Sequence, residues 1–347
     1  MGTMPVFMTA ISTILGAILF LRFGYALAHV GLFYTLAIIL IGHLVTIPTA
    51  LAVAEIATNQ KVEGGGAYYM ISRSFGLNIG GSIGIALFLS QAISVAFYII
   101  AFTVSCRGLI VWAEAEFGYV VEPWMINYGF MAVLTALMLI KGANMGVKAL
   151  YVIVGILLVS LAMFFLGDGP GKAIGTGIFD TIPQELTFFE NGEPSTIQRF
   201  TFFQVFTFIF PAFTGIAAGL GLSGDLKDPK RSIPRGTLWA TVVGIIVYVA
   251  VSFKLFWSAP LDALATDELY LENIAIWGPI IPIGLACAAV SSALGSVMIA
   301  PRTLQALGAD NIIPGKISGI MAKGRKKDNE PINASLITCI IAFIFVS

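Results

Sequence analysis

Two apolar stretches, AISTILGAILF at residues 10–20 and FIFPAFTGIA at residues 208–217, decide the fold of this chain. Each places hydroxyl side chains and a glycine, and the second also a proline, where a continuous membrane helix would carry leucine. Glycine and proline are common in membrane helices, where a single one often produces no more than a kink. Interruptions at matching positions of two halves are instead typical of the midplane binding site of a secondary transporter. The matched pair therefore predicts a transport site formed by two broken helices.

Composition and hydropathy place the chain in a membrane. Hydrophobic residues make up 58% of the 347 residues and charged residues 11%, with a mean hydropathy of +0.92, whereas a soluble domain carries about 25% charged residues. Runs long enough to cross about 30 Å of hydrocarbon recur along the whole sequence. We predict a polytopic all-α protein with a single transmembrane transporter domain over residues 1–347, and no enzyme. The expected spans are 4–28, 32–57, 79–106, 124–140, 147–166, 201–222, 237–257, 280–305 and a last one from about 333.

Lysine and arginine are distributed unevenly between the connections. When the N-terminus is placed inside the cell, most of the 19 basic residues fall in the four connections on the cytoplasmic side. Such a bias sets the orientation of membrane proteins. We therefore predict a multi-pass protein of the cell (plasma) membrane with a cytoplasmic N-terminus. The formal net charge of zero conceals this asymmetry and gives no indication of nucleic-acid binding.

The last apolar stretch is short. It runs from Ala334 to Ser347, and a crossing helix needs about 17–25 residues. We expect the chain to stop within span nine, so that a tenth span and any C-terminal regulatory domain are absent.

The chemistry of the site follows from the two breaks. A break inside a membrane frees backbone N–H and C=O groups, which need partners or ligands. The amides that begin each new half-helix form an anion site, because free N–H groups and the positive end of the helix dipole point at the ligand. These chloride candidates are Gly16, Ala17, Ile18, Gly215, Ile216 and Ala217. Hard oxygen donors for alkali cations precede or lie within the breaks, at Ser12, Thr13, Pro211 and Thr214.

Acidic residues are missing from the middle of every predicted span. A bare charge at the bilayer centre costs at least about 2.5–3.5 kcal/mol, so the charge that balances a cation must travel as substrate. This argues against a proton antiporter, which would need a buried carboxylate relay. Two classes remain open, a cation moving with an inorganic anion and a cation moving with an amino acid. Cysteine and histidine spacings fit no further metal site and no disulfide pattern.

Several motifs resemble those of the cation–chloride cotransporter family, within the amino acid–polyamine–organocation superfamily. They appear in order along nearly the whole chain, and the family segments they match are the first cytoplasmic loop, the loop after span six, and span eight with its following loop. The matching stretches are IATN at 56–59, GGGAYYMISRSFG at 64–76, SGDLKDPKRSIPRGT at 223–237, SSAL at 291–294, APRTLQAL at 300–307 and NEP at 329–331. The chain is identified as a prokaryotic-type member of the sodium–potassium–chloride branch.

The resemblance implies a fold and a cation site. The fold is the broken-helix, five-plus-five inverted-repeat transporter fold, truncated in span nine, in which spans one, two, six and seven move against the others. The family's potassium site maps to Thr13, Ile14, Tyr98, Pro211 and Thr214. The family usually has asparagine at the position of Thr13, so the oxygen donor here is shorter. For Tyr98 taken alone, helix packing with some hydroxyl partner is the alternative.

The family's sodium site also maps onto this chain. It corresponds to Ser12, Leu15, Ala288, Ser291 and Ser292. The potassium–chloride branch lacks hydroxyls at the last two positions, so Ser291 and Ser292 point to sodium coupling. Small hydroxyl residues also mediate packing between membrane helices, which is the alternative reading of this patch.

The implied function is an electroneutral secondary active symporter that moves Na⁺ and K⁺ together with Cl⁻. Its expected partners are these three ions and the lipid bilayer, with a homodimer as the candidate assembly and no cofactor. A sodium–chloride or potassium–chloride cotransporter is the alternative within the family, and a sodium-coupled amino acid permease is the alternative class, since fold does not fix substrate. Gly16 stands alone among bulky neighbours, which favours a monatomic anion over an α-carboxylate.

Overall fold

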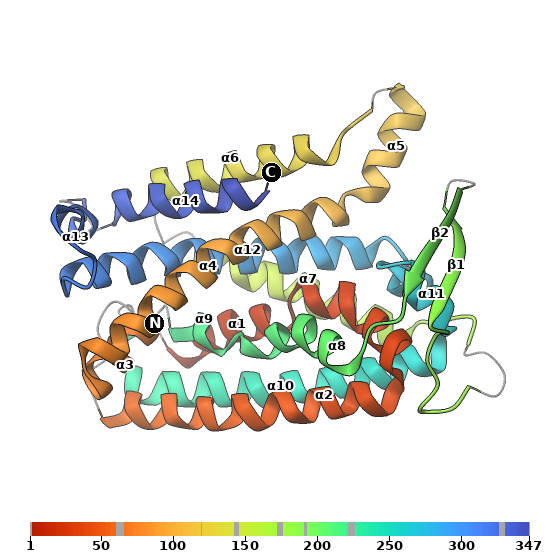
Figure 1. Cartoon of the computed structure of the whole chain (residues 1–347), viewed down its shortest axis with the longest axis horizontal. Coiled ribbons are helices and arrows are strands. Elements are labelled where there is room, and N and C mark those ends of the chain that lie inside the picture. Colours follow the sequence, from red (N-terminus) through yellow and green to blue (C-terminus); the bar gives the residue numbers. More distant parts are fainter. Residues whose placement is uncertain are drawn as a thin grey trace.

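The computed structural model describes residues 2–59, 66–118, 120–141, 146–171, 176–190, 193–220, 226–325 and 330–346. Of the motifs quoted above, residues 64, 65, 223–225 and 329 lie outside these ranges. Within them the chain is predominantly helical, and the long helices run along the long axis of the molecule (Figure 1). The helices of eight or more residues are α1 (Thr3–Ile14), α2 (Ala17–Asn59), α3 (Gly66–Phe75), α4 (Leu77–Ser105), α5 (Arg107–Phe117), α6 (Pro123–Lys141), α7 (Gly146–Leu166), α8 (Phe202–Ile209), α10 (Pro229–Ser258), α12 (Ile280–Ala309) and α14 (Ile332–Val346).

Five helical segments of the described chain are long and apolar enough to cross a membrane, which agrees with the predicted polytopic class. They are Thr3–Asn59, Leu77–Ser105, Phe202–Leu220, Pro229–Ser258 and Ile280–Ala309. Helices α6, α7 and α14 occupy the remaining predicted spans, and the apolar parts Tyr151–Leu166 and Ile332–Val346 are shorter.

The segment Thr3–Asn59 is 57 residues long because it contains two spans that meet at Gly31. Gly31 has φ 78° and ψ 170°, a conformation that glycine adopts far more readily than other residues. A Cβ on Gly31 would also lie 2.9 Å from the carbonyl oxygen of Asp180. The chain reverses there (Figure 1), so the predicted division into spans 4–28 and 32–57 is confirmed.

One predicted boundary is wrong. The span expected to start at 237 belongs to α10, which begins at Pro229. The side chain of Asp228 accepts a hydrogen bond from the Arg231 amide at 3.3 Å, and Pro229 occupies the first turn. An aspartate cap followed by proline is a favourable helix start, so the polar residues before 237 are helical rather than part of a loop.

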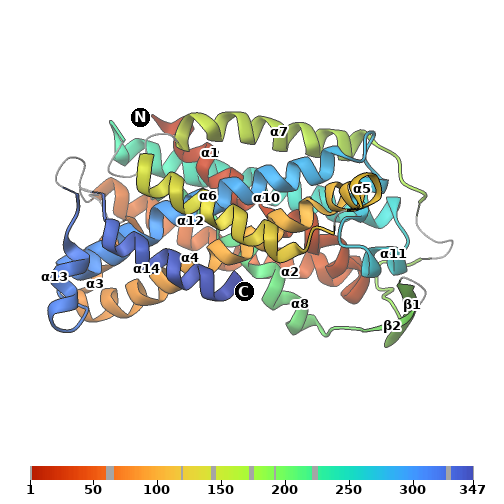
Figure 2. The same cartoon turned by 90° about the horizontal axis from the view of Figure 1, so that it is seen from above.

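The helices form layers around the two broken segments. Helices α2 and α10 pack side by side, as do α4 and α12, and α1 lies between these pairs together with α8 and α9 (Ile216–Leu220) (Figure 1). Helices α6 and α14 cover the outer side of α4, while α7 runs along α12 and α1 (Figure 2). The largest buried cluster gathers residues from α1, α2, α7, α8, α10 and α12.

The predicted connections contain structure that hydropathy alone does not indicate. At one end of the molecule lie α3 and α13 (Lys316–Ala322); at the other lie α5, α11 (Leu261–Thr266) and the antiparallel hairpin of β1 (Glu185–Glu190) and β2 (Glu193–Gln198) (Figures 1 and 2). These elements are short and partly exposed, so they lack the long apolar run by which a spanning helix is recognised.

Candidate ion-binding site

The first predicted break lies between α1 and α2. Helix α1 ends at Ile14, Leu15 has ψ 43°, and α2 begins at Ala17. The hydroxyls of Ser12 and Thr13 both donate to the Thr9 carbonyl at 3.0 Å. Such bonds back to the preceding turn bend helices. The sequence prediction of an interruption at this point is confirmed.

The second break is of another kind. Helix α8 ends at Ile209, a 3₁₀ turn covers Phe210–Thr214, and α9 follows. Pro211, near the start of the turn, lacks the N–H that an α-helix would use there. The Thr214 hydroxyl donates to the Pro211 carbonyl at 2.8 Å. The interruption is therefore a tightened turn rather than an unwound segment.

The two breaks touch each other through their backbones. A Cβ placed on Gly215 would lie 2.7 Å from the Ile14 nitrogen and 3.0 Å from the Thr13 carbonyl carbon. The Tyr248 hydroxyl of α10 donates to the carbonyl of Ile14 and, at 2.9 Å, to that of Ala212. Tyr248 is fully buried and so fastens both breaks to α10. Sequence reasoning missed Tyr248, although a tyrosine in the middle of a predicted span was a usable signal.

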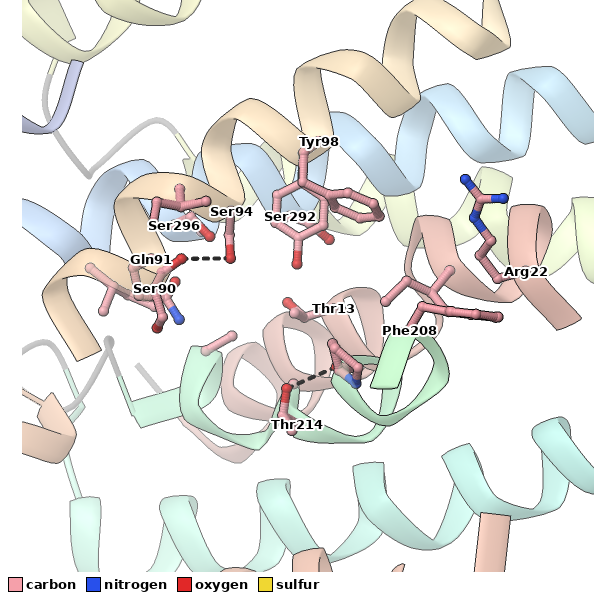
Figure 3. Close-up of a pocket in the computed structure, with 18 residues that line it drawn as sticks. Thr13, Arg22, Ser90, Gln91, Ser94, Tyr98, Phe208, Thr214, Ser292 and Ser296 are labelled. Carbon is pink, nitrogen blue, oxygen red and sulfur yellow. Dashed lines mark hydrogen bonds between the residues drawn. The ribbon is translucent and has the colours of Figure 1, made fainter. Parts of the chain in front are cut away.

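A cavity of about 490 Å³ opens where the breaks meet α4 and α12. Four of the five predicted potassium residues line it, and in Figure 3 the Tyr98 hydroxyl points toward Thr13. The fifth, Ile14, is not among the lining residues, because its carbonyl faces Tyr248. The four residues brought together are Thr13, Tyr98, Pro211 and Thr214.

The predicted sodium residues also come together, at the contact between α1 and α12. The Ser291 hydroxyl donates to the Ser12 hydroxyl at 2.8 Å, while Leu15 and Ala288 are fully buried beside them. Ser292 is 2% exposed, and its hydroxyl lies within reach of the Tyr98 hydroxyl but forms no hydrogen bond of normal geometry with a described residue. It also lines the cavity. A buried hydroxyl without a well-formed hydrogen bond is unfavourable, which is consistent with a ligand position.

The predicted chloride residues lie at the starts of two helices of unequal length. Gly16 immediately precedes α2, Ala17 and Ile18 begin it, and Ile18 lines the cavity. Gly215 also lines the cavity, whereas Ile216 and Ala217 open the five-residue α9, with the side chain of Ala217 outside the described set. The first helix start still has the longer dipole behind it, because α2 continues from Ala17 to the reversal at Gly31 whereas α9 has five residues.

Charge around the cavity is sparse. Among its described lining residues there is no carboxylate, and Arg22 supplies the single formal charge. The Arg22 Nη1 atom lies 2.7 Å from Glu268 Oε1, and its guanidinium carbon lies 5.7 Å from the Tyr25 ring centroid. Sequence reasoning did not place Arg22 at the cavity.

A polar clamp holds the α3 end of the molecule. Asp310, after the last turn of α12, accepts hydrogen bonds from the Tyr68 hydroxyl and the Arg73 guanidinium, each at 2.8 Å. Burial, together with the hydrogen bond to Asp310, raises the pKa of the Tyr68 phenol above its ordinary value. These bonds join α3 to the end of α12. They thereby hold in place one end of a helix whose residues line the cavity.

A pair of broken apolar helices around a cavity with several hydroxyl side chains is typical of membrane transporters, and the comparisons with known proteins identify the family. The chain matches the amino acid permease family over residues 5–346 and belongs to that family. It is 32% identical to solute carrier family 12 member 1 of Mus musculus, over 95% of this chain and 34% of that protein. It is equally 32% identical to solute carrier family 12 member 2 of Mus musculus and of Squalus acanthias, over 95% of this chain and 30% and 31% of those proteins.

These relatives confirm the predicted resemblance to the cation–chloride cotransporter family. The chain spans about a third of the length of the curated relatives that it matches.

Proposed function

We propose that this chain is the transport unit of an electroneutral symporter that carries Na⁺ and K⁺ together with Cl⁻. One observation supports this most directly. The cavity between the breaks is lined by neutral oxygen donors and, among the described residues, by no carboxylate. Neutral oxygens suit alkali cations, and a cation held there needs a companion anion to balance its charge.

The orientation of the hydroxyl groups supports cation binding. Thr13 donates its hydrogen to the Thr9 carbonyl, and Thr214 donates its hydrogen to the Pro211 carbonyl. With these hydrogens committed to the backbone, the oxygen lone pairs remain as acceptors. The cavity wall therefore presents electron pairs, and with Tyr98 and the Pro211 carbonyl it forms the proposed potassium site. The Ile14 carbonyl could bind the ion as well only if it gave up the hydrogen bond that it accepts from Tyr248.

The proposed sodium site lies behind this wall, at Ser12, Leu15, Ala288, Ser291 and Ser292. In the structure Ser291 donates to the Ser12 hydroxyl at 2.8 Å, Ser12 donates to the Thr9 carbonyl, and Ser292 forms no hydrogen bond of normal geometry with a described residue. Sodium would use the oxygens of all three serines. Carbonyls freed by the break at Leu15 would complete its shell.

Chloride is assigned to the helix starts. The amides of Gly16, Ala17 and Ile18 at the start of α2 form the proposed main anion site, because this helix begins at an unwound segment and continues without interruption to Gly31. The amides of Gly215, Ile216 and Ala217 form a second, weaker site, since α9 has five residues. Arg22 also lines the cavity, but its charge is balanced by Glu268 at 2.7 Å, so the helix-start amides carry the anion assignment.

We also propose the five-plus-five inverted repeat and a cytoplasmic N-terminus in the plasma membrane. In support, α1 and α2 pack against α9 and α10 through the matched breaks. The moving bundle would consist of these elements and α8, and α4 and α12 would belong to the static part.

Uptake of ⁸⁶Rb⁺ into vesicles tests the function. We expect uptake to require both Na⁺ and Cl⁻, and replacement of chloride by gluconate should abolish it. Uptake that depends on sodium alone, or that persists in gluconate, would contradict chloride symport. A requirement for Na⁺ and Cl⁻ without any Rb⁺ movement would identify a sodium–chloride cotransporter.

A sodium-coupled amino acid permease is the second candidate. Two observations favour it: the family match is to amino acid permeases, and about 490 Å³ exceeds what single ions need. Arg22 at the cavity would then face a substrate carboxylate. Uptake of radiolabelled amino acids in gluconate medium, driven by sodium, would decide for this candidate.

A further inference from the structure

The cavity extends beyond the residues assigned to the ion sites. On one side of it, Gln91 and Ser94 of α4 lie beside Ser296 of α12, away from Thr13 and Thr214 (Figure 3). Gln91 and Ser94 are half-buried and Ser296 is 5% exposed, so water reaches them chiefly through the cavity. Two helices thus supply three polar side chains to a region that the proposed sites leave empty.

Helix packing does not account for these side chains. Neither the Ser296 hydroxyl nor the Gln91 carboxamide forms a hydrogen bond with any described residue, so neither connects α4 to α12. Between Ser292 and Ser296, Gly295 lines the cavity, and a Cβ placed on it would meet no atom within 4 Å. The interface is open here, whereas polar residues that serve packing bond across it.

The chemistry of the three groups favours a cation. The Ser94 hydroxyl donates to the Ser90 carbonyl at 2.7 Å, which leaves its oxygen as an acceptor. The Gln91 carboxamide oxygen is a second neutral donor of electron pairs, and the Ser296 hydroxyl is free to turn its oxygen to a ligand. Neutral oxygens of this kind suit weakly hydrated alkali cations.

We propose that Gln91, Ser94 and Ser296 form a further alkali-cation site, where a partly hydrated Na⁺ or K⁺ stops on its way between the breaks and the α3 end of the cavity. The inference rests on the proposed cation transport through this same cavity. Water in the cavity completes the shell, because three side-chain oxygens are fewer than the ligands such an ion takes.

Equilibrium binding to purified protein in nanodiscs tests the site apart from transport. We would titrate ⁸⁶Rb⁺ and, in a separate arm, ²²Na⁺ in choline chloride, using Ser296→Ala and the double variant Gln91→Met with Ser296→Ala. Methionine keeps the length of glutamine and removes its oxygen. The control is Ser82→Ala. Ser82 lies on α4, as Gln91 does, but it is exposed and donates only to the Asn78 carbonyl at 3.1 Å.

We expect the double variant to weaken one class of Rb⁺ or Na⁺ sites by about tenfold, with Ser296→Ala intermediate and Ser82→Ala unchanged. Whichever of the two titrations, ⁸⁶Rb⁺ or ²²Na⁺, shows the weaker binding identifies the ion that this site prefers. Wild-type cation affinity and stoichiometry in both variants would overturn the proposal, as would loss of ³⁶Cl⁻ binding with cation binding intact. Because binding is measured without transport, failure of chloride-dependent uptake would refute the symport proposal and leave this result standing.

Discussion

The first break opens the backbone, whereas the second tightens it. Leu15 and Gly16 lie outside both α1 and α2, while Phe210–Thr214 keeps a helical path as a 3₁₀ turn. Unsatisfied N–H and C=O groups occur where a helix ends, so the first break exposes more of them. The comparison indicates unequal roles, in which the first break supplies amides and carbonyls and the second supplies mainly the Pro211 and Thr214 oxygens.

Local chemistry explains the difference. At the first break two hydroxyls bond back to the same Thr9 carbonyl, and Gly16 follows where a Cβ would lie only 2.7 Å from the Thr13 carbonyl oxygen. At the second, Pro211 removes one donor, but the turn closes again at once through the bond from Thr214 to Pro211. Two hydroxyls and a glycine unwind the chain, and a proline with one threonine only changes its pitch.

The largest expected effect comes from separating the two breaks. Gly215→Ala would place a methyl group 2.7 Å from the Ile14 nitrogen, and backbone on both sides leaves little room to move. We expect loss of ⁸⁶Rb⁺ uptake and a fall in stability of about 1–3 kcal/mol, typical of overpacking. The readouts are uptake and Tm of the purified variant.

Gly155→Ala is the matched control for that experiment. Gly155 lies on α7, and a Cβ there would meet no atom within 4 Å. Its Tm should stay level or rise, since alanine favours a helix. Wild-type uptake in Gly215→Ala would mean that the breaks do not need their close contact.

The next effect concerns sodium and the first break. Ser291→Ala with Ser292→Ala removes two of the proposed oxygen ligands but little volume, so the protein should fold. We expect ⁸⁶Rb⁺ uptake to lose its activation by sodium. Because the Ser292 hydroxyl forms no hydrogen bond of normal geometry with a described residue and has only the Tyr98 hydroxyl within reach, Ser292→Ala alone should hold or raise the Tm in sodium-free buffer and abolish the added stabilisation by NaCl.

Ser160→Ala separates a sodium effect from a packing effect. Ser160 on α7 is also fully buried, with a hydroxyl that lacks a hydrogen-bond partner among the described residues. Its replacement should change the sodium-free Tm in the same direction and leave the stabilisation by NaCl intact. If NaCl stabilises Ser160→Ala and Ser292→Ala to the same extent, Ser292 is a packing residue and not a sodium ligand.

The sequence predicted the breaks but not the way in which they are joined. Gly16 and Pro211 break local rules for a helix, and such violations can be read from a single stretch of chain. The contact of Gly215 with Ile14 joins residues about two hundred positions apart. Such a contact depends on the packing of whole helices, which one sequence does not reveal.

The cavity was only half predictable for the same reason. Thr13 and Thr214 followed from the breaks themselves and Tyr98 from the family resemblance, whereas Gln91, Ser94 and Ser296 carried just a weak signal as polar residues in predicted spans. Which face of α4 or α12 they occupy depends on rotation about the helix axis, and long apolar helices with little amphipathic character leave that rotation undetermined. The start of α10 at Pro229 was missed because hydropathy outweighed the capping signal of Asp228 and Pro229.

A smaller effect is expected where α10 joins the breaks. Tyr248→Phe keeps the ring stacked on Phe23, with centroids 4.9 Å apart, and removes the donor shared by Ile14 and Ala212. Leaving buried carbonyls without a donor costs about 1–3 kcal/mol, so we expect a lower Tm with uptake reduced but present. An unchanged Tm would show that the two breaks hold together without α10.

The smallest expected effect tests whether potassium uses both breaks. Tyr98 lies on α4 across the cavity from Thr13 and Thr214 (Figure 3), so its hydroxyl would complete a shell that neither break completes alone. Tyr98→Phe keeps the ring and removes only that oxygen. We expect the apparent KM for ⁸⁶Rb⁺ to rise by about tenfold, equivalent to about 1.4 kcal/mol, with sodium and chloride dependence retained.

Tyr128→Phe is the control, because Tyr128 stacks on Phe343 of α14 and does not line the cavity. Thr13→Asn, which restores the usual donor of the family, should leave the KM equal or lower. If Tyr98→Phe keeps the wild-type KM while Na⁺ and Cl⁻ move without Rb⁺, the potassium site is wrong and the chain is a sodium–chloride symporter.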